Sequence, residues 1–321
     1  MEYRRLGRSA LRVSTLCLGT MNFGPRTPEG DAFRILDAAV DAGINFVDTA
    51  DQYGGALGVG TTESILGRWF AQRPGSRERI VLATKVHEPM SEDVNDRGLS
   101  ARHIRAACDA SLRRLGVDHV DLYQMHHLDR AASVEEIGEA TERLHAQGKI
   151  TYLGSSNFPG WSIARHCERA RARGRLGLVS EQSLYNLLER RVELEVLPAC
   201  REYGLGLIPW SPLAGGALAG SGHAGAGRRA SDAVRDARVR HAEPLAAFEA
   251  LAGELETTPS NLALAWLLHQ DGVTATIVGP ADVDQLSSTL DVPDLALDDS
   301  TLARIDTLFP PCGPAPEAYA W

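Results

Sequence analysis

Eight short apolar segments recur along the chain, and stretches with helical spacing of apolar residues lie between them. The short segments are mostly rich in Val, Ile and Leu and lack period-two alternation, which is typical of strands buried on both faces. The strand segments are residues 15–18, 45–47, 80–83, 119–124, 150–153, 176–179, 205–208 and 274–278. The helical segments are residues 32–42, 62–71, 102–115, 134–147, 162–173, 192–203 and 282–290. This alternation predicts an α/β fold, and it favours a closed (β/α)8 TIM barrel over an open doubly wound sheet.

The ends of the helical segments carry the residues that usually cap helices. Glycine follows several of them, where a left-handed residue commonly ends a helix, and serine precedes others, where its hydroxyl caps the first turn. The candidate C-terminal glycines are Gly43, Gly116, Gly148 and Gly204, and the candidate N-caps are Ser100, Ser133 and Ser260.

Three segments lie outside the repeat of strand and helix. Residues 2–14 alternate weakly around a central Gly-Arg pair, which predicts a short β-hairpin that plugs the barrel floor. Residues 214–243 are rich in Gly, Ala, Arg and Asp, which predicts a mobile loop, and residues 309–321 hold four prolines, which predicts an extended tail. Since one barrel of ~250 residues accounts for most of the chain, we interpret residues 1–321 as a single domain.

Charge and cysteine content exclude several classes of protein. A net charge of −9 argues against non-specific binding to nucleic acid or to anionic membranes. No apolar run approaches the ~20 residues that span a bilayer, and residues 1–10 lack the apolar core of a signal peptide. The five cysteines are dispersed and lack a C-x-x-C pair, so we expect reduced thiols in a cytoplasmic protein. The sequence is compatible with a homo-oligomer and does not define one.

Four reactive side chains follow consecutive predicted strands, which is where barrels carry their catalytic groups. They are Asp48, Tyr53, Lys85 and His126. A free tyrosine has a pKa near ~10, and a nearby ammonium group lowers it, so a Lys–Tyr pair is suited to proton transfer. A carboxylate would keep the lysine charged, and a histidine would orient a substrate oxygen. A buried structural Asp–Lys pair is the alternative, but four such groups at strand ends favour an active site.

Seven ordered motifs resemble those of the aldo-keto reductases over nearly the whole chain. They are residues 18–21, 45–54, 83–85, 121–126, 154–158, 182–186 and 210–216. The resemblance is best to the bacterial group near potassium-channel β subunits. Residues 124–130 and 184–191 are similar to actinobacterial members that act on nucleotide-linked deoxysugars.

The resemblance implies a role for each matching position. The tetrad would be Asp48, Tyr53, Lys85 and His126, with a nicotinamide cofactor extended across the barrel mouth. The cofactor supplies the hydride, and the protein supplies orientation and proton transfer. Ser156, Asn157 and Gln182 would hold the carboxamide, and Trp210 would stack on the ring. The other cofactor-binding positions would be Thr20, Met21 and Asp48, then Ser211, Pro212, Leu213 and Gly215 at the pyrophosphate, and Gly279, Gln285, Ser288 and Thr289 at the adenosine.

The phosphate end departs from the family pattern. Relatives usually carry an arginine that pairs with the 2′-phosphate of NADP, but this chain has Ala281 at that position, followed by Asp282. Two interpretations stay open. Arg228, Arg229 or Arg235 could supply the cation, or the enzyme could accept NAD(H). On family grounds NADP(H) is the expected cofactor.

The substrate pocket is predicted from weaker signals. Phe23, His87 and His127 would line it, and the acidic loop of residues 86–98 counts against a highly anionic substrate. His127 replaces an arginine that is common in relatives. The adjacent histidines 126 and 127 have no third ligand at a recognisable spacing, so no metal is expected. Residues 225–230 match a dinucleotide-binding fingerprint as letters but lack a preceding strand, so we interpret them as loop.

Three functions are compatible with these observations. The leading hypothesis is reduction of a small-molecule aldehyde or ketone carbonyl to an alcohol, with Tyr53 as general acid. The enzymatic alternative is reduction of a nucleotide-linked keto- or 2,3-enoyl deoxysugar. Relatives that reduce steroid double bonds often replace the tetrad histidine with glutamate, so the presence of His126 favours carbonyl reduction. The non-enzymatic alternative is a cofactor-sensing regulatory subunit.

Overall fold

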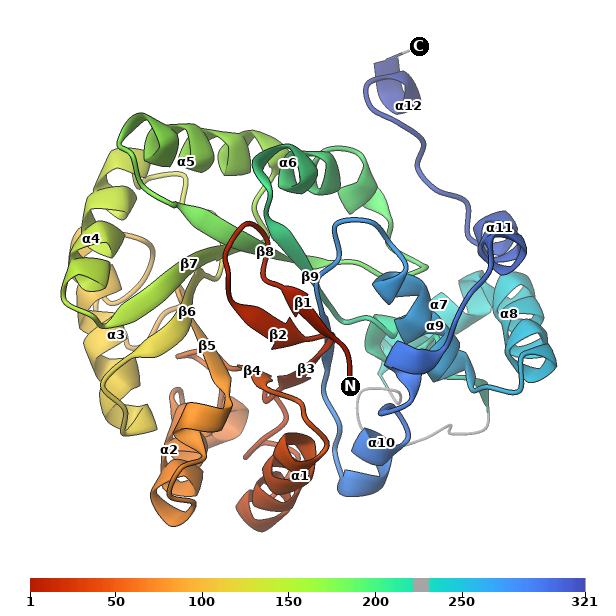
Figure 1. The fold of residues 1–321 in the computed structure, drawn as a ribbon, viewed down its shortest axis with the longest axis horizontal. Coiled ribbons are helices and arrows are strands. Elements are labelled where there is room, and N and C mark those ends of the chain that lie inside the picture. Colours follow the sequence, from red (N-terminus) through yellow and green to blue (C-terminus); the bar gives the residue numbers. More distant parts are fainter. Residues whose placement is uncertain (222–230, 321) are drawn as a thin grey trace.

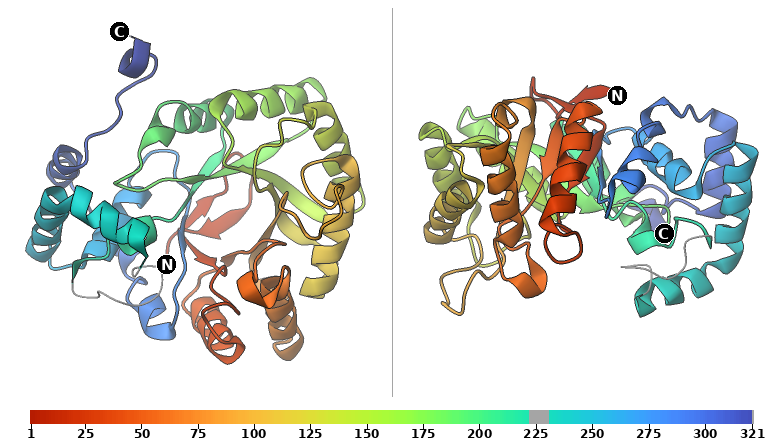
Figure 2. Two further views of the ribbon diagram at one scale, coloured as in Figure 1. Left: turned by 180° about the vertical axis from the view of Figure 1, so that it is seen from behind. Right: turned by 90° about the horizontal axis from the view of Figure 1, so that it is seen from below.

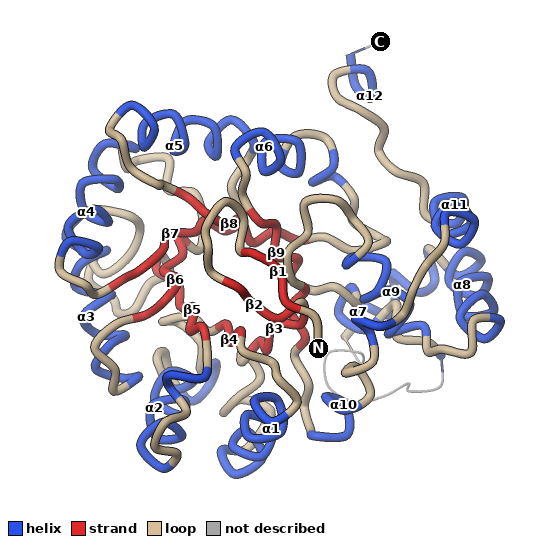
Figure 3. The backbone as a smooth tube through the Cα atoms, viewed as in Figure 1, coloured by secondary structure: helices blue, strands red, loops and turns tan. Residues whose placement is uncertain are grey.

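Eight parallel strands form the centre of the molecule, and helices surround them (Figures 1 and 3). In chain order the strands are β3 (Leu16–Gly19), β4 (Phe46–Asp48), β5 (Val81–Val86), β6 (Val120–Met125), β7 (Ile150–Ser156), β8 (Leu178–Leu184), β9 (Gly206–Trp210) and β10 (Thr276–Val278). The hydrogen-bonded order runs β10-β3-β4-β5-β6-β7-β8-β9. The ring closes where Leu207 of β9 pairs with Val273, flanked by two backbone hydrogen bonds of 2.9 Å. The predicted (β/α)8 barrel is therefore confirmed. This computed structural model describes residues 1–221 and 231–320.

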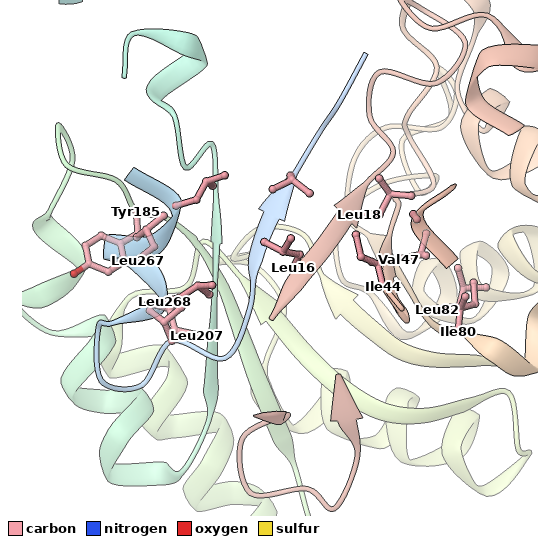
Figure 4. Close-up of a cluster of buried hydrophobic side chains, with 14 of the residues drawn as sticks. Leu16, Leu18, Ile44, Val47, Ile80, Leu82, Tyr185, Leu207, Leu267 and Leu268 are labelled. Atoms are coloured by element: carbon pink, nitrogen blue, oxygen red, sulfur yellow. The ribbon is translucent and has the colours of Figure 1, made fainter. Parts of the chain in front are cut away.

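Side chains of the strands pack in two directions, which explains the unbroken apolar runs of the sequence. One cluster fills the barrel interior, and it includes Cys17, Phe46, Leu122 and Ile208. A larger cluster lies between the barrel and the helices, and Figure 4 shows its members Leu16, Leu18, Val47, Leu82 and Leu207. Because most strand positions are buried on both faces, the strands have few solvent-facing polar residues, and the exposed Thr151 of β7 is an exception.

A β-hairpin closes the N-terminal end of the barrel, as predicted. Its strands β1 (Tyr3–Arg5) and β2 (Arg12–Ser14) pair antiparallel, and Leu6 and Val13 join the interior cluster. Gly7 in the turn has φ +53°, and a Cβ there would lie 2.3 Å from the carbonyl oxygen of Val179. Figure 2 shows the hairpin at one end of the barrel and the loop that follows β4 at the other.

The helices form the outer layer of the barrel. Among the described residues, three of them follow β9 and three more follow β10. They are α1 (Glu29–Asp41), α2 (Thr61–Gln72), α3 (Ala101–Leu115), α4 (Val134–Ala146), α5 (Gly160–Ala172), α6 (Val196–Tyr203), α7 (Asp232–Arg240), α8 (Ala242–Glu254), α9 (Pro259–Leu268), α10 (Val283–Ser287), α11 (Asp299–Leu308) and α12 (Glu317–Ala320). Across the part of the chain that the structure describes, none of these helices combines the length and apolar character needed to cross a bilayer.

Most of the predicted caps are present, and one is displaced. The hydroxyls of Ser100 and Ser133 accept hydrogen bonds from the first turns of α3 and α4. The four predicted glycines all have positive φ. The prediction for Ser260 is wrong, because Thr258 caps α9 and accepts from the N–H of Asn261. Pro259 occupies the first turn, where its missing N–H costs nothing.

Three predicted segments differ from the structure. Within the loop expected at 214–243, α7 occupies Asp232–Arg240 and is capped by Ser231, while residues 222–230, with the fingerprint-like letters, lie outside the described residues. The helix expected at 282–290 is shorter, because α10 ends at Ser287. The tail expected to be extended includes the short helix α12 and stands away from the barrel (Figures 1 and 2).

Candidate active site

Three reactive side chains stand at neighbouring strand ends, opposite the hairpin. Asp48 ends β4, Lys85 lies near the end of β5, and His126 directly follows β6. Tyr53 lies in the loop after β4, and Gly54 shapes that loop, because a Cβ there would lie 1.8 Å from a carbonyl oxygen. The structure therefore brings the four predicted tetrad residues together at one mouth of the barrel.

Lys85 is the centre of the hydrogen bonds in this cluster. Its ammonium group donates to Asp48 Oδ2 over 2.6 Å, to the Thr49 carbonyl over 2.8 Å and to the Tyr53 hydroxyl over 3.2 Å. The side chain is fully buried. Burial disfavours the charge, but Asp48 and Tyr53 outweigh it and raise the pKa of Lys85 above its ordinary value. Each of the three ammonium protons therefore has a hydrogen-bond acceptor, and one of these acceptors is the phenol oxygen of Tyr53.

Two glutamines donate hydrogen bonds to the second oxygen of Asp48, and only one of them was a predicted site residue. Asp48 Oδ1 accepts from Gln182 Nε2 over 2.9 Å and from Gln124 Nε2 over 3.0 Å. Gln182 was predicted at the cofactor carboxamide, but Gln124 was not singled out. The signal for Gln124 is its register, because it pairs directly with Lys85 across β5 and β6. With both oxygens bonded, the carboxylate is fixed in orientation.

His126 lies beside the tyrosine, and its surroundings favour the neutral imidazole. Its ring centroid lies 6.0 Å from that of Tyr53, at an interplanar angle of 74°. Burial, together with the charge of Lys85 and the neighbouring His127 and His87, lowers the pKa of His126 to about 2. Among the described residues its Nδ1 is buried without a hydrogen-bond partner. A buried unpaired N–H costs more than an unpaired lone pair, so we assign the proton to Nε2, which makes this nitrogen a donor.

The predicted carboxamide and stacking residues meet beside this cluster. Trp210 at the end of β9 is half-buried, and its Nε1 donates to Asn157 Oδ1 over 3.0 Å. Asn157 Nδ2 donates to the His126 carbonyl over 3.1 Å, and Ser156 Oγ donates to the Gln182 carbonyl over 2.8 Å. An aromatic plane next to amide and hydroxyl groups is chemically suited to a nicotinamide ring and its carboxamide.

The residues predicted at the pyrophosphate form a tight turn after β9. Ser211 has φ +52°, and its Oγ accepts from the Gly215 N–H over 3.2 Å. Asn186 Nδ2 holds the Ser211 carbonyl over 3.0 Å. Pro212 is buried, whereas Leu213 and Gly215 are half-buried. The turn is therefore held by hydrogen bonds before any ligand binds.

Thr20 and Met21, after β3, occupy different environments. Thr20 is fully buried, and its hydroxyl donates to the Asp48 carbonyl over 2.9 Å. Met21 is 42% exposed. Thr20 therefore supports the backbone of β4, and Met21 is the residue of this pair that a ligand can reach.

The predicted adenosine residues lie on and around α10. The Gly279 carbonyl accepts from Asn22 over 3.0 Å. Ala281 N–H donates to Gln285 Oε1 over 3.0 Å, and Gln285 Nε2 donates to Asp282 Oδ2 over 2.9 Å. Ser288 and Thr289 end the helix and donate their hydroxyls to backbone carbonyls in it. Asp282 also caps α10, so its carboxylate is engaged locally.

Three arginines were the predicted candidates to supply a cation for a 2′-phosphate. Arg228 and Arg229 lie outside the described residues. Arg235 lies on α7 and pairs with Asp232. Ala281, where the resemblance implied an arginine, is exposed and offers no charge of its own.

The predicted substrate residues occupy two environments. His127 and His87 lie together at the barrel mouth, and Phe23 lies in the core. His127 stacks on His126 with ring centroids 5.0 Å apart and an interplanar angle of 16°. Glu88 Oε1 lies 3.2 Å from His127 Nε2 and 3.3 Å from His87 Nδ1, so a carboxylate that the prediction omitted joins the two imidazoles. Phe23 is fully buried in the core cluster, and Thr62 Oγ1 donates to its carbonyl over 2.9 Å, so its place in the pocket wall stays a prediction.

Metal binding has no support in residues 1–221 and 231–320. No group of three or more His, Cys, Asp or Glu side chains there is placed to hold an ion.

Known proteins match this chain over most or all of its length. A family profile described as "Aldo/keto reductase family" matches residues 15–309. The chain is 50% identical to the "Uncharacterized oxidoreductase YrpG" of Bacillus subtilis, with all of both chains covered. It is 33% identical to "Protein tas" of Escherichia coli over 96% of this chain and 97% of that one. It is 31% identical to "Norsolorinic acid reductase A" of Aspergillus parasiticus over 96% of this chain and 81% of that one.

Proposed function

Because the chain belongs to the aldo/keto reductase family, we propose that it reduces an aldehyde or ketone carbonyl of a small molecule to an alcohol. We propose NADP(H) as the cofactor, with NAD(H) as the alternative. The observation that carries the proposal is the position of the Tyr53 hydroxyl, 3.2 Å from a buried ammonium group that a carboxylate holds at 2.6 Å. A relative with "reductase" in its name supports the direction of the reaction.

The side chains of the site have separate roles in this proposal. When bound, the nicotinamide supplies the hydride, and Trp210, Asn157 and Ser156 would hold it. Tyr53 donates its proton to the carbonyl oxygen as charge develops there. Lys85 stabilises the phenolate that remains, and Asp48 fixes Lys85. His126 donates a hydrogen bond from Nε2 to the same oxygen and so orients the substrate.

The test is turnover of a simple carbonyl substrate. The purified protein with NADPH and 4-nitrobenzaldehyde is expected to form 4-nitrobenzyl alcohol, one molecule for each NADPH oxidised. A quinone and a TDP-linked keto sugar, assayed in parallel, examine the alternative substrate class. If the protein turns over only the TDP-linked sugar, the substrate class is a nucleotide-linked keto sugar and not a simple aldehyde or ketone. If every substrate fails with both NADPH and NADH, the proposed activity is wrong.

The cofactor choice leads to a prediction at position 281. Ala281→Arg is expected to lower the Kd for NADPH by about tenfold and to leave the Kd for NADH within about twofold, since a charge-assisted hydrogen bond to a phosphate contributes roughly 1.5–3 kcal/mol. Quenching of tryptophan fluorescence measures both constants. Ala281→Gln is the control of similar length without charge. Unchanged NADPH binding in Ala281→Arg would mean that position 281 does not face the phosphate.

Glu88, which lies beside His87 and His127 at the mouth, leads to a prediction about substrate charge. Glu88→Gln is expected to raise kcat/KM for the anion 4-carboxybenzaldehyde roughly fivefold, because two like charges about 8 Å apart at an effective dielectric constant of about 40 repel by about 1 kcal/mol. The kcat/KM for neutral 4-nitrobenzaldehyde should stay within about twofold. Glu92→Gln removes the same charge from an exposed position of the same loop and should change neither value. Equal gains for both aldehydes would contradict the electrostatic explanation.

A further inference from the structure

Glu181 is a fully buried acid that has no part in the reaction proposed above. It lies on β8 next to Gln182, whose side chain points into the barrel toward Asp48. Successive side chains of a strand point to opposite faces, so Glu181 points outward, toward the layer of helices. The thiol of Cys200 on α6 lies close enough for the charge of Glu181 to contribute to its raised pKa.

The carboxylate of Glu181 is surrounded by neutral donors. Its Oε1 accepts from the Ser183 hydroxyl over 2.7 Å and from the Phe158 N–H over 3.1 Å, and its Oε2 accepts from the Ser155 hydroxyl. Within the part of the chain that the structure describes, no Lys, Arg or His forms an ion pair with it. A buried carboxylate without a counter-ion depends on such hydrogen bonds for its charged form.

Two of these donors belong to the turn that carries the predicted carboxamide residues. Ser155 and Phe158 flank Ser156 and Asn157, and Asn157 has φ +57°. Left-handed backbone is uncommon outside glycine, and asparagine is one of the residues that adopt it more readily. The Gln182 carbonyl holds the Asn157 N–H over 3.0 Å, and Glu181 holds the next N–H along the chain. The turn is thus hydrogen-bonded to two consecutive residues of β8.

We propose that Glu181 is a positioning residue for the nicotinamide cofactor, because its buried carboxylate holds the 155–158 turn in the conformation that presents Ser156 and Asn157 to the carboxamide. This assignment rests on the proposed function. The carboxylate acts as an acceptor for every group around it. A protonated or amide side chain would turn one acceptor oxygen of Glu181 into a donor group, so a serine hydroxyl beside it would have to reverse its hydrogen bond, and the turn would lose the charge-assisted part of its support.

The proposal has a pH dependence whose sign follows from the acceptor role. Burial, opposed by the hydrogen bonds of Ser155 and Ser183, raises the pKa of Glu181 to about 7. The titratable groups that face this region from the helices are Cys200 on α6, and Cys167 and His166 on α5. Burial raises the pKa of both thiols and lowers the pKa of His166, so these groups are uncharged at neutral pH. Cofactor affinity should therefore fall as the pH falls through about 7.

The experiment measures the Kd for NADPH and for NADH by fluorescence quenching between about pH 6 and pH 8. If only the carboxylate form binds, one titration near pH 7 makes the wild-type Kd about tenfold higher at pH 6 than at pH 8. Glu181→Gln should bind more weakly at pH 8, with a Kd that is flat across this range. Ser183→Ala removes one donor and should move the midpoint to higher pH. Ser180→Ala is its matched control, since that buried hydroxyl has no partner among the described residues.

The outcomes separate the two proposals. If the wild type binds neither nucleotide, the proposed function fails and this assignment fails with it. If the wild type binds and Glu181→Gln keeps the same pH dependence, the assignment alone is overturned. Should Glu181→Gln not fold, as judged by thermal melting, the comparison of Ser183→Ala with Ser180→Ala decides, and an unmoved midpoint in Ser183→Ala overturns the assignment.

Discussion

Replacing Tyr53 by phenylalanine is expected to lower kcat/KM for 4-nitrobenzaldehyde by about 10²–10⁴-fold, the contribution that a positioned general acid makes. The substitution removes one oxygen atom, the acceptor of a 3.2 Å hydrogen bond from Lys85, and leaves the ring in place against His126. Lys85 keeps its bonds to Asp48 and to the Thr49 carbonyl. The loss should therefore appear in kcat, as measured by NADPH oxidation under saturating cofactor.

Two controls separate loss of the proton donor from loss of structure. The Kd for NADPH and the melting temperature of Tyr53→Phe should stay close to those of the wild type. Tyr152→Phe removes a hydroxyl from a tyrosine that packs against the interior cluster of the barrel, and it should reduce the aldehyde normally. Equal rates for Tyr53→Phe and wild type would remove Tyr53 from the role of general acid.

The barrel and the tetrad were predictable for the same physical reason. Strands buried on both faces produce short unbroken apolar runs, and the first polar residue after each run must lie at the mouth. Asp48 and His126 stand at such positions. The same pattern fails for α9, in which residues 262–268 are all buried. A helix that is apolar on every side has no amphipathic period, so the chain offered no sign of where it begins.

Two buried polar residues that the sequence did not single out contact their partners across the sheet. Gln124 lies at the end of one predicted apolar run and Glu181 lies just after another, and their contacts depend on which residues face them across the sheet. Gln124 meets Asp48 from β6, and Glu181 meets the turn after β7 from β8. The role of Phe23 stays a prediction for a related reason. A phenylalanine next to a ligand-binding loop can either line the pocket or pack in the core. The conformation of the loop determines which of the two it does.

Removing the counter-charge of Lys85 is expected to destabilise the protein by about 3–5 kcal/mol, the cost of leaving a buried charge without its partner. In Asp48→Asn, the amide oxygen could still accept from the Lys85 ammonium, as the Thr49 carbonyl and the Tyr53 hydroxyl do, but no negative charge would balance the ammonium in a site with no exposure to water. Lys85→Met should cost less, because Asp48 retains the amide donors of Gln124 and Gln182. The free energy of unfolding in urea measures both.

The double variant Asp48→Asn/Lys85→Met distinguishes a structural pair from a catalytic one. With both charges removed, no buried charge stays unpaired, so most of the lost stability should return, as it does when buried ion pairs are replaced by neutral groups. Reduction of 4-nitrobenzaldehyde should not return, because the Tyr53 phenolate would have no ammonium beside it to stabilise it. Recovery of stability without activity assigns the pair to proton transfer, whereas recovery of both would reduce Asp48 and Lys85 to a structural ion pair.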